Sequence, residues 1–212
     1  MSRTVAAFDV DAQKTFTPLC PDELPVPGGD EIVDELNANA ALARYRIGSR
    51  DAHPDNARWI AEDPADVFAP VEGDNIDVRW PRHAMMGTLG FELLDGLPHP
   101  FTGYDFMVSK GLDVDCHPYG ACYHDLGDTR STGVIEFLKS KGVTTVIVGG
   151  LALDYCVATT VMQLRAADFE VILNLAASRG IADASVEKAL TGMREAGVLF
   201  ASDSREVKTL LA

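Results

Sequence analysis

Several polar residues that directly follow short apolar runs could carry out nucleophilic catalysis together. Asp11 follows the first of these runs, Asp51 and His53 follow a second, and Lys110 and Cys156 follow two more. A cysteine thiolate attacks carbonyl carbons, a carboxylate can accept and donate the proton, and an ammonium can hold both negative groups in place. These residue types predict a reacting unit made of Asp11, Lys110 and Cys156.

Cys156 lies in the segment GGLALDYCVATT (149–160), just after the apolar run VTTVIV. If a helix begins at Cys156, the backbone N–H groups of its first turn and the helix dipole stabilise a thiolate there. The same N–H groups, with a second donor from the GGLAL turn, could hold the oxyanion of a tetrahedral intermediate. A lone cysteine is more often a small buried apolar residue, and that alternative stays open.

A second set of residues has the composition of a metal site. Asp51 and His53 are spaced D-x-H, so both side chains point to the same side of an extended chain, and the segment RWPRHAMMGT adds His83. One carboxylate and two imidazoles suit zinc, iron or manganese and leave positions for water or substrate. Alternatively, His53 is a loop histidine that is hydrogen-bonded to Asp51. The other histidines are expected to face solvent or to make local hydrogen bonds: His99, His117 and His124.

The elements that must position these residues alternate between apolar runs and amphipathic segments. The runs predict strands over residues 4–10, 45–50, 105–110, 144–150, 170–175 and 198–202. Helical periodicity predicts helices over about residues 30–44, 131–141, 156–168 and 184–196. This alternation is typical of an α/β fold with a mainly parallel central sheet of about six strands and helices on both faces. Since ligands bind beyond the carboxyl ends of such strands, Asp11, Asp51 and Lys110 are expected at one edge.

Composition limits the class of partner. The chain has 212 residues, 47% of them hydrophobic, which predicts a single domain over 1–212. A net charge of -14 repels nucleic acid and membrane surfaces, so we expect a small-molecule substrate and neither of those partners. The chain has no long apolar run, no signal-peptide pattern and four cysteines without CxxC spacing, so we expect a cytoplasmic protein with free thiols. We also expect a homo-oligomer, and a functional role for the irregular stretch 51–103.

Seven segments of the chain form a recognisable series. They are DAQKTF (11–16), LPVPGGDEIV (24–33), SRDAHP (49–54), WPRH (80–83), GT (87–88), SKG (109–111) and GGLALDYCV (149–157). Together they closely resemble nicotinamidases, the metal-containing members of the isochorismatase-like cysteine hydrolases. The resemblance implies the following residues: Asp11, Lys110 and Cys156 for catalysis; Asp51, His53 and His83 for the metal; the N–H groups of Ala152 and Cys156 for the oxyanion hole, with a cis peptide between Leu151 and Ala152; and Phe16, Trp80 and Tyr155 beside the substrate ring.

The same resemblance implies an activity. The chain is expected to hydrolyse nicotinamide to nicotinate and ammonia, and also pyrazinamide, through a cysteine thioester in NAD recycling. One divalent metal ion would bind the ring nitrogen of the substrate, with zinc expected and iron or manganese as alternatives. Glu62 could supply a fourth ligand, although a solvated loop glutamate is the simpler expectation. Two other functions stay open: a sibling metal-containing cysteine amidase for another small amide, and a metal-binding scaffold that has lost catalysis.

The chain departs from the family pattern at positions that bear on substrate range and metal preference. Thr15 replaces a common aspartate, and Ala57 stands where many members have another histidine. Ala84 and Met86 replace a cysteine and a glutamine beside the metal. The segment HPYGACY (117–123) replaces the usual DSYSAF.

Overall fold

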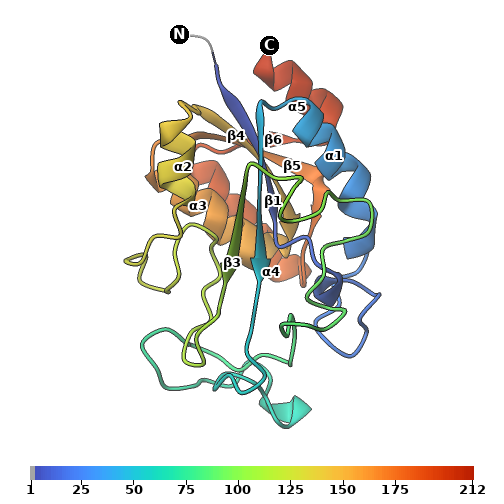
Figure 1. The fold of residues 1–212 in the computed structure, drawn as a ribbon, viewed down its shortest axis with the longest axis vertical. Helices are drawn as coiled ribbons and strands as arrows, with labels where there is room; N and C mark the ends of the chain where they lie inside the picture. Colours follow the sequence, from blue (N-terminus) through green and yellow to red (C-terminus); the bar gives the residue numbers. More distant parts are fainter. Residues whose placement is uncertain (1–2) are drawn as a thin grey trace.

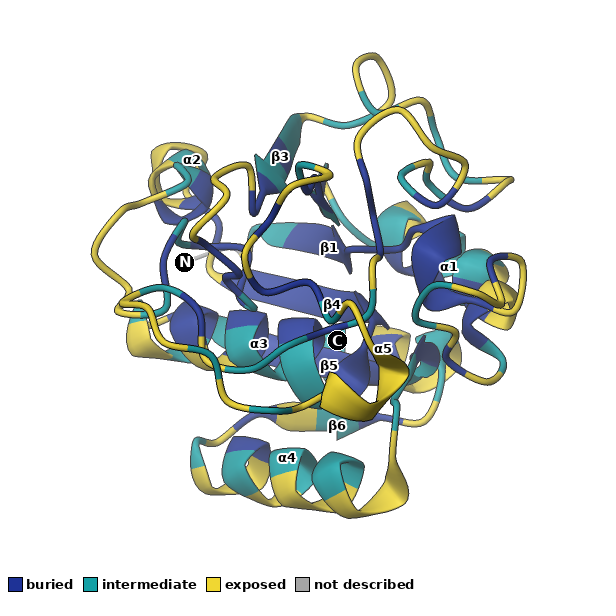
Figure 2. Ribbon diagram, turned by 90° about the horizontal axis from the view of Figure 1, so that it is seen from below, coloured by how far each residue is buried: buried dark blue, intermediate teal, exposed yellow. Residues whose placement is uncertain are grey.

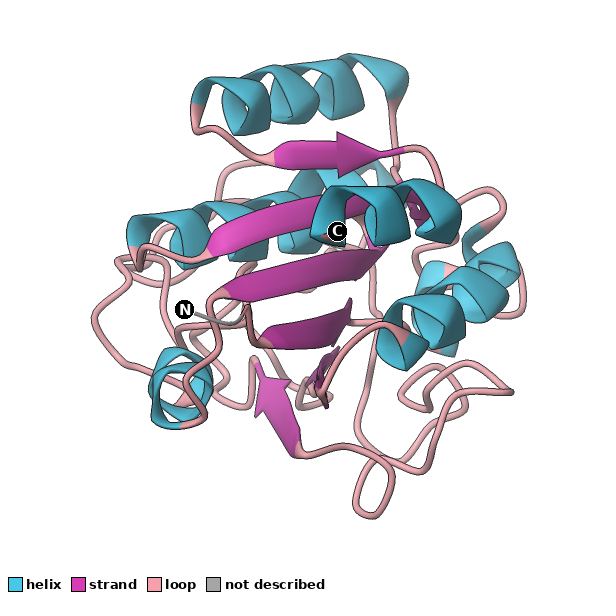
Figure 3. Cartoon of the chain, turned by 90° about the horizontal axis from the view of Figure 1, so that it is seen from above, coloured by secondary structure: helices cyan, strands magenta, loops and turns pink. Residues whose placement is uncertain are grey.

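The computed structural model describes residues 3–212, which contain one six-stranded sheet with all neighbouring strands parallel (Figure 3). The strands are β1 (Val5–Val10), β2 (Tyr45–Asp51), β3 (Phe106–Lys110), β4 (Thr145–Leu151), β5 (Glu170–Arg179) and β6 (Leu199–Ala201). They lie in the order β3-β2-β1-β4-β5-β6. The predicted α/β fold class is confirmed, and the main difference in the strands is that β5 continues to Arg179 instead of ending at Leu175.

Helices cover both faces of the sheet. Those in the described residues are α1 (Val33–Ala41), α2 (Val134–Ser140), α3 (Ala158–Ala166), α4 (Asp183–Glu195) and α5 (Ser204–Leu211). Helices α1 and α5 lie on one face and α2 and α3 on the other (Figure 1). Helix α5 is missing from the sequence prediction. Its N-cap is Asp203, whose carboxylate accepts hydrogen bonds from the N–H groups of Arg205 and Glu206.

The central strands are buried on both faces, as expected for a parallel sheet between helices (Figure 2). Every residue of β4 is buried, and so are all residues of β1 after Val5. Two glycines of β4 are required by packing. A Cβ atom at Gly149 would lie 2.7 Å from the Cβ of Ala177, and one at Gly150 would lie 1.9 Å from the carbonyl oxygen of Val10. The paired glycines therefore let the end of β4 lie close to its neighbouring strands.

The segment after β4 differs from the prediction of a helix that begins at Cys156. Residues Leu153–Val157 form a π-helical turn, and α3 begins at Ala158. The N–H of Val157 donates to the carbonyl oxygen of Ala152 at 3.1 Å, which closes this wide turn. Cys156 therefore lies inside a π-helical turn that runs directly into α3, and the helical segment begins three residues earlier than predicted.

Long loops gather at the carboxyl ends of the strands, in the lower part of Figure 1. Most of residues 52–105 and 111–133 lie outside helices and strands, apart from a 3-10 turn at Pro64–Asp66. The predicted irregular stretch is therefore present, and it lies at the edge of the sheet where the candidate residues were expected. Among residues 3–212, no helix is both long enough and apolar enough to cross a bilayer.

Candidate active site and metal centre

Strand register places three charged residues at one edge of the sheet. Asp51 ends β2 and pairs directly with Lys110, which ends β3. Asp11 follows β1, and its N–H donates to the carbonyl oxygen of Ser49 at 3.1 Å. The Nζ atom of Lys110 lies 3.0 Å from Oδ2 of Asp11 and 2.5 Å from Oδ1 of Asp51. All three charged residues are buried, so the structure brings together the residues that were expected at this edge.

Cys156 lies against the same charges. Its Sγ atom is 3.7 Å from Nζ of Lys110 and within 4.8 Å of a carboxylate oxygen of both Asp11 and Asp51. Burial raises the pKa of Cys156 well above that of an ordinary thiol. The charge of Lys110 opposes this effect, and the charges of the two aspartates reinforce it. The sulfur therefore rests as a neutral thiol beside carboxylates that could take its proton.

The charged groups of this buried cluster shift one another: burial raises the pKa of Asp11 above its usual value, although the charge of Lys110 opposes this effect. Burial acts to lower the pKa of Lys110, but Asp11 and Asp51 hold it well above its usual value. Burial also acts to raise the pKa of Asp51, yet the charge of Lys110 holds it well below its usual range. When both carboxylates are ionised, they share one ammonium. The excess negative charge would be stabilised by a bound cation.

Neutral side chains hold the two carboxylates in place. The hydroxyl of Ser49 donates to Oδ1 of Asp11 at 2.6 Å. The amide of Gln13 makes two hydrogen bonds to the backbone of Asp51, accepting from its N–H at 2.7 Å and donating to its carbonyl oxygen at 2.9 Å. Gln13 thus fixes the end of β2 to the chain that leaves β1. Sequence reasoning missed this role, although the spacing D-x-Q directly after a strand was a usable signal.

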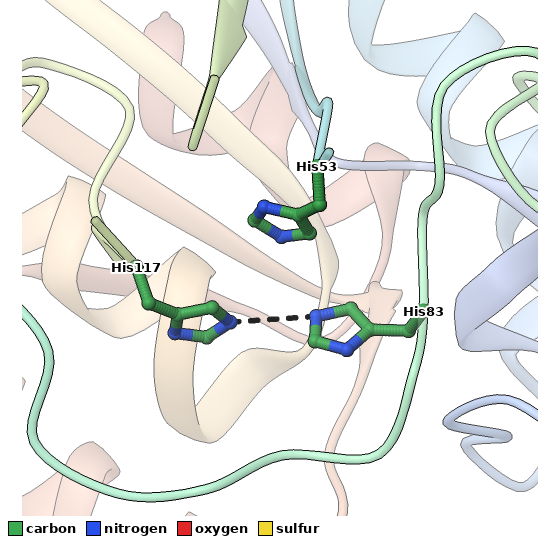
Figure 4. Close-up of side chains that lie close together, drawn as sticks. All are labelled: His53, His83 and His117. Atoms are coloured by element: carbon green, nitrogen blue, oxygen red, sulfur yellow. Dashed lines mark hydrogen bonds between the residues drawn. The ribbon is translucent and has the colours of Figure 1, made fainter. Parts of the chain in front are cut away.

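Three buried histidines converge beside the charged cluster (Figure 4). One ring nitrogen each of His53, His83 and His117 lies within 4.8 Å of the others. The Nδ1 atom of His53 is 3.0 Å from the carbonyl oxygen of Gly111, and that of His83 is 2.7 Å from the carbonyl oxygen of Pro81. Because a carbonyl oxygen only accepts hydrogen bonds, these contacts place the proton on Nδ1 and leave a lone pair on Nε2.

The prediction that His117 faces solvent or makes only local hydrogen bonds is wrong. The residue is 4% exposed, and its Nε2 lies 3.4 Å from Nε2 of His83. Its backbone N–H donates to the carbonyl oxygen of Asn75 at 2.8 Å, which ties the loop after β3 to the irregular stretch. Burial lowers the pKa of His83 to about 3 and that of His117 well below its usual value, so both rings stay neutral. His99 is exposed and His124 is half-buried, in line with their predictions.

The structure brings the three predicted metal ligands together only in part: His53 and His83 belong to one group of neighbouring ligand atoms, and Asp51 belongs to another group with Asp11 and Cys156. Oδ1 of Asp51 is 3.7 Å from Nε2 of His53, and this nitrogen has no hydrogen-bond partner within residues 3–212. A buried lone pair without a donor, next to a carboxylate, fits a cation better than a packing role. Together with His83, this donor set suits zinc or a similar borderline metal. Glu62 is exposed, as expected for a solvated loop residue.

Backbone hydrogen bonds connect the two loops that carry His53 and His83. The N–H of His53 donates to the carbonyl oxygen of Ala84, and the N–H of Met86 donates to that of His53, both at 3.1 Å. Ala84 has a φ of 49° and donates its own N–H to Oγ1 of Thr15 at 2.9 Å and to Oε2 of Glu23 at 3.1 Å. Thr15 also donates its hydroxyl to Glu23. Glu23 therefore supplies a carboxylate beside Thr15, which stands where the family commonly has an aspartate.

A mainly aromatic pocket opens beside Cys156 and the histidines, with an empty volume of about 270 Å³. Its lining residues are Phe16, Leu24, Asp51, Trp80, His83, His117, Tyr119, Ala152, Tyr155, Cys156 and Ile181. All three residues that were predicted to contact the substrate ring belong to this lining. Leu24, Tyr119 and Ile181 were not predicted. Aromatic walls next to a thiol suit a flat ring that carries a reactive group.

Two further features shape the pocket wall. The peptide bond between Leu151 and Ala152 is cis, as the family resemblance implies. The indole N–H of Trp80 donates to the hydroxyl oxygen of Tyr119 at 3.2 Å, and this hydroxyl donates to Oδ1 of Asp77 at 2.8 Å. These bonds hold Tyr119 in the wall and connect it to the irregular stretch.

The fold and the site together define a class of protein: a parallel α/β sheet with a buried cysteine, aspartate and lysine at its carboxyl edge, next to a cluster of histidines. The family model of the isochorismatase domain matches residues 10–203. The chain therefore belongs to the isochorismatase domain family.

Similar proteins point to one branch of that family. The nicotinamidase of Acinetobacter baylyi is 29% identical over 199 residues, which cover 91% of this chain and 90% of that protein. The structure of a nicotinamidase/pyrazinamidase of Acinetobacter baumanii is 29% identical, with a TM-score of 0.86 over 98% of this chain and 99% of that one.

Two other structures of similar proteins contain ligands. PnC1 from L. infantum, in complex with nicotinate, is 28% identical, with a TM-score of 0.80 over 95% of this chain and 93% of that one. The pyrazinamidase of Pyrococcus horikoshii, in complex with zinc, is 28% identical, with a TM-score of 0.73 over 93% of this chain and 98% of that one. The resemblance to nicotinamidases stated from the sequence is confirmed.

Proposed function

We propose that this chain hydrolyses nicotinamide, and also pyrazinamide, to the carboxylic acid and ammonia, with Cys156 as the nucleophile. The observation that carries this proposal is the position of the Cys156 thiol. Its sulfur lies 3.7 Å from the buried ammonium of Lys110 and lines the aromatic pocket. Nicotinamidases that are 28–29% identical over most of this chain support the choice of substrate.

The first half of the reaction forms a thioester. Asp11 accepts the proton of the Cys156 thiol as the sulfur bonds to the carboxamide carbon. The N–H groups of Ala152 and Cys156 hold the negative oxygen of the tetrahedral intermediate. Asp11 then gives the proton to the amide nitrogen, the carbon–nitrogen bond breaks, and ammonia leaves.

The second half releases the acid. Asp11 takes a proton from a water molecule whose oxygen attacks the thioester carbon, and the carbon–sulfur bond then breaks. The sulfur recovers the proton as the carboxylic acid leaves, which restores the thiol. Lys110 stays protonated throughout, and its ion pair with Asp11 at 3.0 Å holds the carboxylate beside the sulfur.

A metal ion would contribute to recognition of the ring. When held by Asp51, His53 and His83, a divalent ion would supply a Lewis-acidic position for the ring nitrogen of the substrate. We propose zinc, because two imidazoles and a carboxylate match its ligand preferences. The aromatic side chains orient the rest of the ring: Trp80 and Tyr155 meet edge to face, with centroids 4.9 Å apart and an interplanar angle of 88°.

A sibling amidase for another small amide is the second candidate function. It is favoured by the segment 117–123, which departs from the family pattern and places Tyr119 in the pocket wall. The hydroxyl of Tyr119 is already bonded to Asp77, so a substrate with a different polar group could use the same pair. A metal-binding scaffold without catalysis is disfavoured, because the thiol, the carboxylate and the ammonium lie together.

Three broader predictions stay proposals. We propose one hydrolase domain over residues 1–212 and a role in NAD recycling in the cytoplasm, where the four free cysteines would stay reduced. We also propose a homo-oligomer, for which light scattering of the purified protein is the direct measurement.

Ammonia release from a panel of amides tests the proposed function. Metal-loaded protein should hydrolyse nicotinamide and pyrazinamide, and benzamide at least about a hundredfold more slowly, because benzamide lacks the ring nitrogen. Cys156→Ala should abolish turnover of every amide while nicotinamide still binds, since affinity comes from the ring pocket. Comparable rates for benzamide and nicotinamide would move the assignment to the sibling amidase. Retained activity in Cys156→Ala would remove the cysteine from the mechanism.

A further inference from the structure

We infer that His117 is a fourth protein ligand of the proposed metal site, binding the ion through Nε2 beside His53, His83 and Asp51. The inference rests on the proposed function only in that both use a divalent ion at this position. It concerns a residue outside the three predicted ligands, in the segment HPYGACY that departs from the family pattern.

The distance between two ring nitrogens is the first support. Two nitrogens bound to one tetrahedral zinc at about 2.0–2.1 Å lie about 3.3–3.4 Å apart. The Nε2 atoms of His83 and His117 are 3.4 Å apart. Figure 4 shows these two rings pointing at each other, with the ring of His53 next to both. His117 already lies at the separation that a shared ion requires.

The state of the neighbouring lone pairs is the second support. Carbonyl oxygens hold the protons of His53 and His83 on Nδ1, so the Nε2 atoms of both rings present lone pairs. Nε2 of His117 faces that same space. Three imidazole nitrogens therefore face one small volume, and Oδ1 of Asp51 lies 3.7 Å from one of them, Nε2 of His53. Three imidazoles with a carboxylate nearby are a donor set that suits a divalent metal.

Packing holds the His117 ring where it is. The ring contacts Trp59, with centroids 4.5 Å apart, and stacks on Trp80 at 5.7 Å and an interplanar angle of 19°. As a purely structural residue, His117 would make one polar contact through its side chain and leave Nδ1 without a partner within residues 3–212. Burying a half-satisfied ring is costly, and a metal bond at Nε2 would offset that cost.

A fourth ligand changes what the site can bind. Three imidazoles and one carboxylate favour zinc over manganese more strongly than two imidazoles and one carboxylate do. Four protein ligands would fill a tetrahedral site, so the ring nitrogen of the substrate would have to enter as a fifth ligand.

The experiment uses the full chain, stripped of metal and reloaded with Zn²⁺. X-ray absorption of the wild type should require three imidazoles around zinc, and His117→Phe, which keeps an aromatic ring between the tryptophans, should require two. Zinc affinity, measured by competition with a chromophoric chelator, should fall by at least about a hundredfold in His117→Phe, because loss of a direct ligand exceeds loss of an outer-shell contact. His124→Phe, on the same loop, is the matched control and should change neither quantity.

The outcomes separate this inference from the proposed function, because neither measurement involves an amide. Two imidazoles around zinc in the wild type, or an unchanged affinity in His117→Phe, would overturn the ligand assignment. A wild-type protein that binds no divalent ion would overturn it as well. Three imidazoles in a protein that fails to release ammonia from nicotinamide would keep His117 as a ligand and discard the substrate. The imidazole count in the wild type decides the matter even if the variant does not fold.

Discussion

The two halves of the site are built in different ways. Asp11, Asp51 and Lys110 stand at the ends of neighbouring strands, where sheet register fixes their separation. His83 and His117 stand on loops, where contacts with other loops and with aromatic rings fix their positions. The strand-borne half is a network of buried charges, and the loop-borne half is a set of neutral rings.

This difference gives the two halves of the site different roles in the reaction. The charged network surrounds the sulfur of Cys156, so it can move protons and stabilise charge during the reaction. The neutral imidazoles present lone pairs to a cation, so they can select a metal and, through it, a substrate. Sheet register is rigid and suits chemistry, in which small displacements are costly, whereas loops can vary and so change specificity. Substitutions in the two halves should therefore have separable effects.

The largest effect is expected at Asp11. Asp11→Asn keeps the shape of the side chain but cannot accept a proton, so kcat should fall by about a hundredfold or more, the scale of a general base. Zinc affinity should stay nearly unchanged, because Asp11 is not among the proposed metal ligands. Steady-state kinetics and chelator competition on the same preparation measure both quantities. Asp9→Asn is the matched control: this carboxylate is also buried on β1 but pairs with Arg46, so its loss should lower stability and spare kcat.

Lys110→Ala tests whether Lys110 and Asp11 act as one unit. It should lower kcat about as much as Asp11→Asn does, because it leaves the charges around Cys156 uncompensated. The double variant should lose little more than either single variant, since both changes disable one unit. Fully additive losses would mean that the two residues act independently, contrary to the shared ion pair at 3.0 Å.

A second prediction concerns the protonation state of the thiol. The pKa of Cys156 is raised by burial and by the two aspartates, so the reactive thiolate is a small fraction of the sulfur at neutral pH and grows as the pH rises. Alkylation of Cys156 by iodoacetamide in the substrate-free protein should therefore accelerate by about tenfold per pH unit between about pH 7 and pH 9. Mass spectrometry of the labelled peptide follows this residue apart from the other cysteines. A plateau that begins below about pH 8 would indicate a preformed thiolate paired with Lys110.

The strand-borne half of the site could be predicted from the sequence for a physical reason. Buried parallel strands are continuous apolar runs, and the polar residue that ends each run must lie at the carboxyl edge of the sheet. Asp11, Asp51 and Lys110 followed from that rule alone. The fold class followed from the same runs and from the amphipathic segments between them. The residue types of the D-x-H segment and of RWPRHAMMGT added His53 and His83, and the family motifs then added the cis peptide and the aromatic lining of the pocket.

The structural features that could not be predicted from the sequence depend mainly on contacts between distant segments. His117 is buried only because its loop bonds to Asn75 and packs on Trp59, and no periodic pattern in the sequence encodes those contacts. The turn that carries Cys156 has the composition of a helix start, and its wide π-helical geometry depends on how the chain leaves β4. Helix α5 was missed although Val207, Leu210 and Leu211 recur at helical spacing and Asp203 marks its N-cap, so usable sequence signals were present.

The smallest expected effect lies at Glu23, which supports the loop-borne half from outside. Its carboxylate accepts hydrogen bonds from Thr15 and from the N–H of Ala84, the residue next to His83. Glu23→Ala would leave that N–H with Thr15 alone and loosen the His83 loop. We expect zinc affinity to fall by about tenfold, the lower range for a contact outside the metal ligands. At saturating zinc, kcat should change little, because the charged network around Cys156 is untouched.

Glu92→Ala, which removes a surface ion pair with Lys14, is the control and should leave zinc affinity unchanged. If Glu23→Ala lowers kcat at saturating zinc as strongly as it lowers zinc affinity, the two halves of the site are coupled and the division between register-held chemistry and loop-held recognition is wrong.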